Sequence, residues 1–271
     1  MSVMAFMDGL LEDAGQLLVE SFGQVRSVSA KADRSLVTDA DLACDRLICQ
    51  QIRSRYPNDA ILTEESGEIG VRADRSGATW IVDPLDGTTN FAHGYPFFSV
   101  SIARGRRDSS GLFQVEAAGI IDPMRQVKYM AERGGGAYRN SERMQVTQDV
   151  ALADAFLVTG FYYQRGQELV KDLEIFGEIS DACHAVRRDG SAALDLALVA
   201  SGVFHGFWER GLQPWDVAAG SLLIEEAQGV IRNYQSPSKQ ASFDVFGHGL
   251  IAGGTELVDS LMNKVKFAKL C

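Results

Sequence analysis

Hydrophobic residues near the start of the chain recur every three or four positions, a spacing typical of an amphipathic helix. This pattern covers residues 10–22 and stops at a glycine. A second helix is predicted to begin at Thr38, because its hydroxyl can cap the helix while Asp41, three residues later, completes a capping box. Its hydrophobic positions continue until Tyr56, where a proline follows.

Shorter hydrophobic runs come next, and they fit β-strands better than helices. Ala60–Thr63 and Thr79–Val82 are strand-like, and acidic residues follow each of them. Apolar positions then partly alternate over Pro96–Ala103 and Phe113–Ile121, and Val127–Ala131 completes the series. Partial alternation over consecutive runs is typical of an antiparallel sheet.

From about residue 150 onward, strands and helices follow one another in the manner of a layered α/β protein. The predicted elements are the strand Phe156–Thr159, the helices Gln167–Ala182 and Ser191–Ala200, the strand Val203–Trp208, the helix Trp215–Gln228 and the strand Val230–Arg232. We therefore predict an α/β fold with an α+β N-terminal half, residues 1–145, and an α/β C-terminal half, residues 146–271.

The composition is that of a folded globular protein, with 46% hydrophobic and 23% charged residues among 271. A formal net charge of −10 argues against a protein that coats nucleic acid. The four cysteines lack metal-binding spacing and are predicted to be reduced packing residues. The chain begins without the pattern of a secretory leader, and no apolar run reaches the roughly 18 residues of a membrane span. We expect a soluble, cytoplasmic protein that contacts neither membrane nor nucleic acid directly.

The most informative stretch is the run from Asp83 to Thr88, Asp-Pro-Leu-Asp-Gly-Thr, which follows an apolar strand. Pro84 is predicted to end that strand, so that Asp83 and Asp86 converge instead of alternating across a sheet. Two converging carboxylates repel each other unless a cation lies between them, and Mg²⁺ prefers such oxygen ligands. Gly87 and Thr88 would offer backbone N–H groups to a phosphate oxygen. Asp-Pro and Asp-Gly pairs also form ordinary turns, which is the structural alternative.

Two further acidic positions lie at the ends of predicted elements. Glu64 follows the strand Ala60–Thr63, and Asp216 lies at the start of the helix Trp215–Gln228. Taken alone, Glu64 is typical of a surface loop, and Asp216 is typical of a helix cap. The residues alone do not decide between these structural roles and a role in metal binding.

Taken together, these segments resemble those of the inositol monophosphatase family. The resemblance rests on Thr63–Ser66, Asp83–Phe91 and Trp215–Gly220, in this order, and on the flanking segments Lys31 with Leu36–Asp41 and Arg187 with Gly190–Ala193. It extends from the N-terminal helix to beyond Gly229. The implied fold is a layered α-β-α-β-α sandwich of the inositol monophosphatase and fructose-1,6-bisphosphatase type, usually a homodimer.

The resemblance also implies an activity, the Mg²⁺-dependent hydrolysis of phosphate monoesters such as myo-inositol 1-phosphate by an activated water. Two or three Mg²⁺ ions and inhibition by lithium belong to the same expectation. By the family pattern, Glu64, Asp83 and the carbonyl of Leu85 hold the first ion, and Asp83, Asp86 and Asp216 hold the second. Thr88 is expected to orient the attacking water, with Asp41 accepting the threonine proton and Glu64 serving as a proton acceptor as well as a ligand.

The implied substrate site places the phosphate on the Gly87 and Thr88 amides. The polyol would lie against Asp86, the Ala192 backbone, Glu209 and Asp216, and Lys31 would lie in a loop near the metals. Each assignment has a structural alternative: Asp41 as a helix cap only, Glu209 paired with Arg210, and Lys31 as a solvated side chain. Gln213 stands where relatives often have histidine, which weakens the prediction for the substrate rim.

Other functions share part of this pattern. Phosphatases acting on fructose 1,6-bisphosphate, 3′-phosphoadenosine 5′-phosphate or histidinol phosphate carry the same acidic core, although Asn90, Glu209 and Trp215 favour the inositol type. A regulatory protein that keeps the fold and acts through protein partners is the alternative from another class. Such a protein is expected to have lost metal ligands, whereas Glu64, Asp83, Asp86 and Asp216 are all present here.

Overall fold

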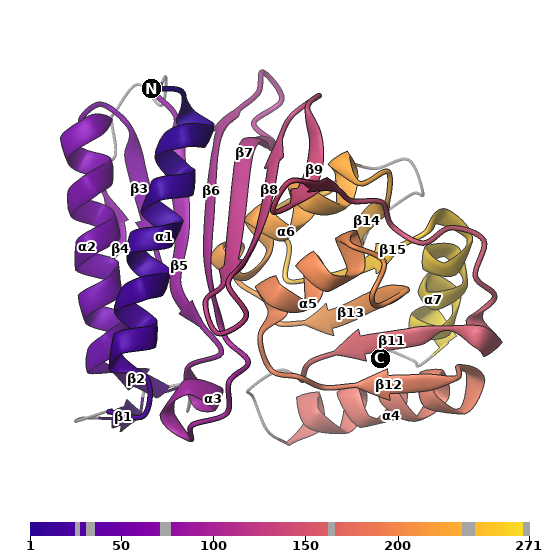
Figure 1. The fold of residues 1–271 in the computed structure, drawn as a ribbon. Helices are drawn as coiled ribbons and strands as arrows, with labels where there is room; N and C mark the ends of the chain where they lie inside the picture. The colour runs from indigo at the N-terminus through magenta and orange to yellow at the C-terminus, as the bar shows by residue number, and fades with distance from the viewer. Residues whose placement is uncertain (25–27, 31–35, 71–76, 162–165, 235–241, 268–271) are drawn as a thin grey trace.

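The computed structural model describes residues 1–24, 28–30, 36–70, 77–161, 166–234 and 242–267. These residues form five alternating layers of helices and sheets (Figure 1). Two helices cover one face of a large sheet, two more lie between that sheet and a smaller one, and the last two cover the outer face of the smaller sheet. The predicted layered sandwich is confirmed.

The first layer consists of α1 (Val3–Ser21) and α2 (Asp39–Arg55), which lie side by side. Both begin with side-chain caps, Ser2 for α1 and the predicted Thr38 and Asp41 capping box for α2. Their apolar faces pack on the large sheet and form one hydrophobic cluster with it. The short strands β1 (Val28–Ala30) and β2 (Leu36–Thr38) pair with each other before α2.

The second layer is an eight-stranded sheet in the order β10-β9-β8-β7-β6-β5-β3-β4. Its strands are β3 (Ala60–Thr63), β4 (Gly67–Ile69), β5 (Thr79–Asp86), β6 (Ser99–Arg107), β7 (Phe113–Asp122), β8 (Val127–Glu132), β9 (Gly136–Arg139) and β10 (Glu142–Arg143). The pairing is antiparallel throughout except between β3 and β5, which run parallel. The carboxyl ends of β3 and β5 therefore meet at one edge, and the short helix α3 (Thr88–Ala92) begins there.

The middle layer consists of α5 (Ala192–Ala200) and α6 (Pro214–Glu226). Both helices are buried over most of their length, because they pack against the large sheet on one side and the small sheet on the other. They approach each other closely at Gly220, where an added Cβ would come within 2.5 Å of Leu196 Cδ1.

The small sheet has the order β12-β11-β13-β15-β14, with β11 parallel to both of its neighbours and the other pairs antiparallel. Its strands are β11 (Phe156–Thr159), β12 (Ala185–Arg187), β13 (Gly206–Arg210), β14 (Val230–Asn233) and β15 (Gly249–Gly253). The helices α4 (Gln167–Ala182) and α7 (Thr255–Phe267) pack on its outer face, and a short 3₁₀ turn, η1 (Leu152–Asp154), precedes it.

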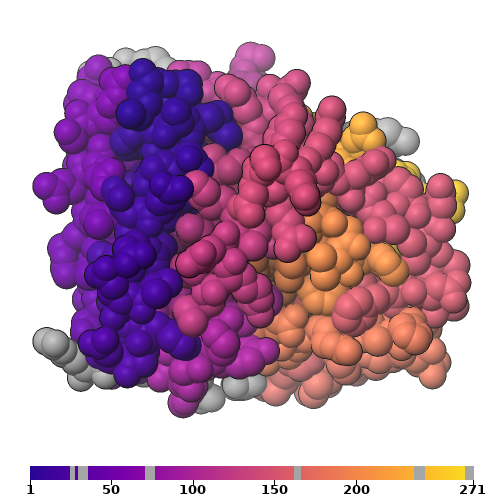
Figure 2. Space-filling model, viewed as in Figure 1, coloured from indigo at the N-terminus to yellow at the C-terminus, as the bar shows by residue number. Residues whose placement is uncertain are grey.

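The strands of the two sheets fall on either side of the predicted division near residue 145, yet the two parts share a core. One hydrophobic cluster contains Phe113 and Ala131 from the large sheet together with Leu222 and Ala252 from the second half. Figure 2 shows the two halves in contact across the viewed face. The division into residues 1–145 and 146–271 stays a prediction. In the part of the chain that the structure describes, no helix is both long and apolar enough to cross a membrane.

Candidate metal centre

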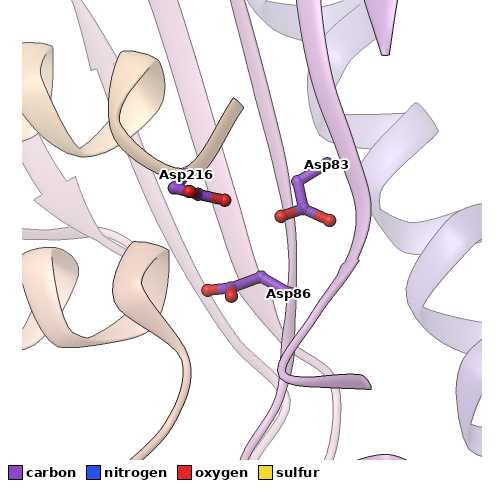
Figure 3. A group of neighbouring side chains, drawn as sticks. All are labelled: Asp83, Asp86 and Asp216. Atoms are coloured by element: carbon purple, nitrogen blue, oxygen red, sulfur yellow. The ribbon is translucent and has the colours of Figure 1, made fainter. Parts of the chain in front are cut away.

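Three carboxylates from two distant parts of the chain meet between the large sheet and α6. They belong to Asp83 and Asp86 on β5 and to Asp216 on α6, and one oxygen from each lies within 4.8 Å of the others. Figure 3 shows the three side chains pointing toward one common space. Oxygen atoms from three carboxylates form a donor set suited to a hard divalent cation.

A bulge in β5 lets Asp83 and Asp86 lie on the same side of the sheet. Asp83 pairs with Ser101 and Asp86 with Ser99, so the residues between them include one more on β5 than on β6. In a regular strand, residues three apart point to opposite faces, and the extra residue corrects this. The prediction that Pro84 ends the strand is wrong: β5 continues to Asp86, because the missing N–H of the proline falls where the ladder is interrupted.

Asp216 is held at the start of α6 by its own helix. Its carboxylate accepts a hydrogen bond of 2.7 Å from the backbone N–H of Gln213, and Pro214 begins the helix. Ser101 donates to the Trp215 carbonyl at 3.2 Å, which ties the start of α6 to β6. The predicted cap and the predicted metal ligand are thus compatible, because one oxygen accepts the backbone bond while the carboxylate still faces Asp83 and Asp86.

Burial and mutual repulsion make these carboxylates unusual acids. The pKa of Asp83 is raised well above its ordinary value by burial first, and then by the charges of Glu64, Asp86 and Asp216. Burial, followed by the charges of Asp86 and Glu64, likewise raises the pKa of Asp216. A divalent cation among these oxygens would remove the repulsion and favour the ionised forms. The residues present therefore fit a metal ion.

Glu64 lies beside this group but outside it. It follows β3 directly, and its backbone N–H donates to the Val82 carbonyl on the parallel strand β5 at 3.2 Å. The three carboxylates within 4.8 Å of one another do not include it, although its charge raises the pKa of both Asp83 and Asp216. Its role as a ligand stays a prediction.

Thr88 and Asp41 form a hydrogen-bonded pair next to the acidic group. The Thr88 hydroxyl lies 2.9 Å from Asp41 Oδ1 and 3.0 Å from the Leu85 carbonyl. The other oxygen of Asp41 accepts from the backbone N–H and the hydroxyl of Thr38, which completes the helix cap. Asp41 is fully buried, and burial raises its pKa. The structure thus shows Asp41 as both a cap and the partner of Thr88.

The start of α5 contacts the same site through Asp86. The Asp86 carboxylate accepts hydrogen bonds from the Ser191 hydroxyl at 2.6 Å and from the Ala193 N–H at 2.8 Å. Ala192, the predicted substrate contact, lies between these two donors in the chain. Ser191 and Ala193 were not predicted as site residues, although both lie in the Gly-Ser-Ala-Ala run that contributed to the family resemblance.

Glu209 lies near the end of β13, and its carboxylate lies against Gly160, where an added Cβ would come within 2.2 Å of either oxygen. Burial and the charge of Asp86 raise the Glu209 pKa to about 8. In the described part of the chain, Glu209 makes no ion pair with Arg210, so that alternative is wrong. The Arg210 guanidinium instead contacts Asp172 at 2.7 Å and Glu168 at 3.0 Å, both on α4.

The roles expected for Gly87, the Leu85 carbonyl and Lys31 stay predictions. Gly87 has a left-handed backbone with φ of 92°, and a Cβ there would lie 3.1 Å from the Phe97 carbonyl oxygen, so glycine fits this turn. The Leu85 N–H donates to Asp83 Oδ1 at 3.1 Å. Lys31 lies outside the described residues.

Comparisons with known proteins agree with this fold. Residues 2–269 match the model of the inositol monophosphatase family. The chain is 42% identical over 222 residues to inositol-1-monophosphatase of Rhizobium meliloti, which is 80% of this chain and 79% of that protein. It is 38% identical over 260 residues to Nus factor SuhB of Pseudomonas aeruginosa, 93% of this chain and 92% of that protein.

Among solved structures, the extragenic suppressor protein suhB of Bartonella henselae superposes with a TM-score of 0.88 at 36% identity, over 98% of this chain and 99% of that one. The fold, the acidic cluster and these relatives together define a metal-dependent phosphatase that acts on phosphate esters. The chain belongs to the inositol monophosphatase family.

Proposed function

We propose that the protein is a Mg²⁺-dependent phosphomonoesterase that hydrolyses myo-inositol 1-phosphate and related polyol monophosphates to the free polyol and phosphate. The observation that carries this proposal is the meeting of Asp83, Asp86 and Asp216 within 4.8 Å beside the Thr88 and Asp41 pair. Cation-binding oxygens and a hydroxyl able to orient water are thereby brought to one place, as phosphate ester hydrolysis requires.

The metal ligands follow from these positions and from the family. Glu64, Asp83 and the Leu85 carbonyl would hold one ion, and Asp83, Asp86 and Asp216 would hold a second. When bound, Mg²⁺ supplies positive charge that polarises the phosphate ester and neutralises the leaving oxygen. The three clustered donors are all carboxylates, and such hard oxygen ligands favour Mg²⁺ over zinc.

The chain's own residues orient the nucleophile. The Thr88 hydroxyl directs its proton to Asp41 or to the Leu85 carbonyl, which leaves the lone pairs of its oxygen to accept a hydrogen bond from a water. Asp41 is anchored by Thr38, so this acceptor of the hydroxyl proton is held in place. Glu64 is the proposed acceptor of the water proton. It directly follows β3, whose carboxyl end lies beside that of β5 in the parallel pair.

The substrate would bind across the two halves. Its phosphate would lie on the Gly87 and Thr88 amides, because the first N–H groups of a helix lack intrahelical acceptors. Its hydroxyls would contact Asp86, the Ala192 backbone, Asp216 and Glu209. With a pKa of about 8, the Glu209 carboxyl is largely protonated at neutral pH in the metal-free protein and can both donate to and accept from a polyol hydroxyl.

A panel of phosphomonoesters assayed with Mg²⁺ tests the substrate. Myo-inositol 1-phosphate and glycerol 2-phosphate are compared with fructose 1,6-bisphosphate, 3′-phosphoadenosine 5′-phosphate and histidinol phosphate by phosphate release. We expect the highest kcat/KM for the inositol ester. Equal or faster turnover of the bisphosphate or the adenylate would contradict the inositol assignment while keeping the phosphatase class.

We also expect a cytoplasmic homodimer that lithium inhibits, as the family resemblance implies. Sedimentation velocity measures the oligomeric state, and a lithium titration of the initial rate measures the inhibition. A monomer at micromolar concentration would contradict the first expectation, and a rate unaffected by lithium would contradict the second.

A regulatory role through protein partners is the second candidate, since several relatives are named Nus factor SuhB. The retained acidic cluster favours catalysis, and a partner role would be an addition to it. Affinity capture from cell lysate is done with the wild type and with a catalytically inactive Asp83→Asn variant. The comparison shows whether partner binding depends on catalysis. Partners captured equally by both proteins would support a role that does not depend on catalysis.

A further inference from the structure

We propose that Asp45 is a positioning residue, whose carboxylate fixes the turn that carries Glu64 and thereby sets the affinity for the metal. This inference rests on the proposed function, because it uses Glu64 as a metal ligand. Asp45 lies on α2, is only 2% exposed, and does not belong to the acidic group of Asp83, Asp86 and Asp216.

The contacts of Asp45 flank Glu64 on both sides. The Thr63 hydroxyl donates to one carboxylate oxygen of Asp45, and the Ser66 hydroxyl donates to the other. Thr63 is the last residue of β3 and Ser66 the last residue before β4, so the two hydroxyls bracket the turn. The Thr63 hydroxyl also accepts the Glu65 N–H at 3.2 Å. A single carboxylate therefore holds both ends of the segment that carries Glu64.

The position of the turn at the edge of the sheet explains why an anchor matters. The turn joins β3 to β4, a three-residue strand at the edge of the sheet. Its backbone returns through Gly67, which has a left-handed φ of 69°. An edge hairpin of this length is weakly restrained by its own pairing, so the two hydroxyl contacts with Asp45 add the restraint that fixes the turn.

The anchor lies on a well-packed helix. α2 packs on the large sheet through buried residues that include Cys44 and Ile48 next to Asp45. Asp41 lies one helical turn before Asp45, and residues four apart share a helix face. One face of α2 thus presents two buried carboxylates, of which Asp41 holds Thr88 and Asp45 holds the Glu64 turn. The helix fixes the distance between the water-orienting hydroxyl and the proposed metal ligand.

The test uses Asp45→Asn in the full-length protein. One oxygen of Asp45 becomes an NH₂ group, which cannot accept the hydroxyl proton, so one end of the turn is released at nearly constant volume. We expect Mg²⁺ binding, measured by isothermal titration calorimetry without substrate, to weaken about 10-fold, as when a group that orients a metal ligand is lost. The Mg²⁺ concentration for half-maximal activity should rise by a similar factor, and excess Mg²⁺ should restore kcat with KM unchanged.

Asp59→Asn is the matched control. Asp59 is also a largely buried carboxylate, exposed by 12%, and it accepts from Trp80 Nε1 at 3.0 Å and from Arg104 Nε at 2.9 Å. It lies just before β3, at the end of the strand opposite Glu64. We expect this variant to lose stability and to keep wild-type Mg²⁺ affinity.

Thr63→Val with Ser66→Ala removes the same contacts from the other side. This double variant is expected to weaken Mg²⁺ binding by a similar factor, and it replaces Asp45→Asn if that variant does not fold. Wild-type Mg²⁺ affinity in both sets of variants would overturn the role of Asp45 and leave the proposed function intact. Failure of the wild type to bind Mg²⁺ would overturn the proposed function itself, and with it this inference.

Discussion

At the residue scale, the chemistry of this protein depends on carboxylates that are buried with polar partners and close to one another. Asp86 accepts two hydrogen bonds from the start of α5, and Asp216 accepts one from its own helix cap. These bonds orient the oxygens and lower the two pKa values, but burial raises both, and for Asp216 the charges of Asp86 and Glu64 add a repulsion that the bonds do not remove. A cation does remove it, so the metal-free site stores an unfavourable charge arrangement that binding relieves.

Asp83→Asn tests the shared ligand at the centre of this arrangement. The amide oxygen can still accept the Leu85 N–H, while one negative charge of both proposed metal sites is lost. We expect kcat/KM to fall at least about 100-fold, the scale of losing one preorganised electrostatic contact. The melting temperature of the metal-free variant should not be lower than that of the wild type, because a repulsive buried charge is gone. A normal rate would contradict the shared-ligand role.

Glu209→Gln tests the proposed contact with the polyol. We expect KM for myo-inositol 1-phosphate to rise more than kcat falls, because a binding contact that is equal in ground and transition states affects KM. The measurement is steady-state kinetics at saturating Mg²⁺. An unchanged KM would remove Glu209 from the substrate site.

Gly160→Ala tests the same contact without changing the carboxylate. The new Cβ would come within 2.2 Å of the Glu209 oxygens, and the end of a flexible side chain is the group that moves. We therefore expect KM to rise as in Glu209→Gln, with little loss of stability. Gly177→Ala on α4 is the control, because nothing lies within 4 Å of its added Cβ. Equal KM values for the two alanine variants would show that Glu209 does not depend on Gly160.

At the element scale, the site depends on α5 and α6 crossing closely in the middle layer. α6 carries Asp216, and the start of α5 binds Asp86, so their separation sets where the two carboxylates meet. Gly220 permits the approach, since an added Cβ would come within 2.6 Å of Leu196 Cβ, which cannot swing away. The backbones themselves would have to move apart to admit a side chain there.

Gly220→Ala tests this crossing. Overpacking of this kind costs about 1–3 kcal/mol of the free energy of unfolding. We expect that loss in urea denaturation, together with weaker Mg²⁺ binding in calorimetry because Asp216 is displaced. Gly9→Ala on α1 provides the comparison, because its added Cβ meets nothing within 4 Å. If Gly220→Ala proved as stable as that variant, the crossing would tolerate more volume than the structure indicates.

The elements with local sequence signals were predicted well. α4 begins and ends where the spacing indicated, and the capping box placed the start of α2 at Thr38. The strand predicted at Val203–Trp208 instead forms at Gly206–Arg210, because its position is decided by pairing with β11 and β15. β15 was not predicted, since Gly249–Gly253 is buried throughout and shows no alternation, and β12 was not predicted because it has only three residues. α7 was also not predicted, although Thr255–Phe267 is long enough for a helix signal.

At the scale of the whole molecule, the buried acids link folding to pH. The folded pKa of Glu209, about 8, lies above its ordinary value of 4.5, and burial raises those of Asp83, Asp86 and Asp216 in the same direction. For an acid whose folded pKa is raised, the folded state binds more protons than the unfolded state between the two values. Stability therefore falls as pH rises through that window.

We expect the melting temperature of the metal-free protein to fall by a few degrees between about pH 5 and pH 8, and the stabilisation by added Mg²⁺ to grow over the same range. Mg²⁺ requires ionised carboxylates, so protons compete with it at low pH. Differential scanning fluorimetry with and without EDTA measures both trends. Mg²⁺ stabilisation that was greater at pH 5 than at pH 8 would contradict a carboxylate site.

The sequence by itself determined the helices with clear periodicity, the Thr38 cap, and the Asp83–Thr88 run that pointed to metal and phosphate chemistry. These signals involve residues a few positions apart, whose interactions follow from the local backbone. Tertiary structure decided that Asp216 meets Asp83, that a bulge turns Asp83 and Asp86 to one side, and that Asp45 holds the turn of Glu64. Such meetings depend on strand order and helix crossing, which the packing of the whole core fixes.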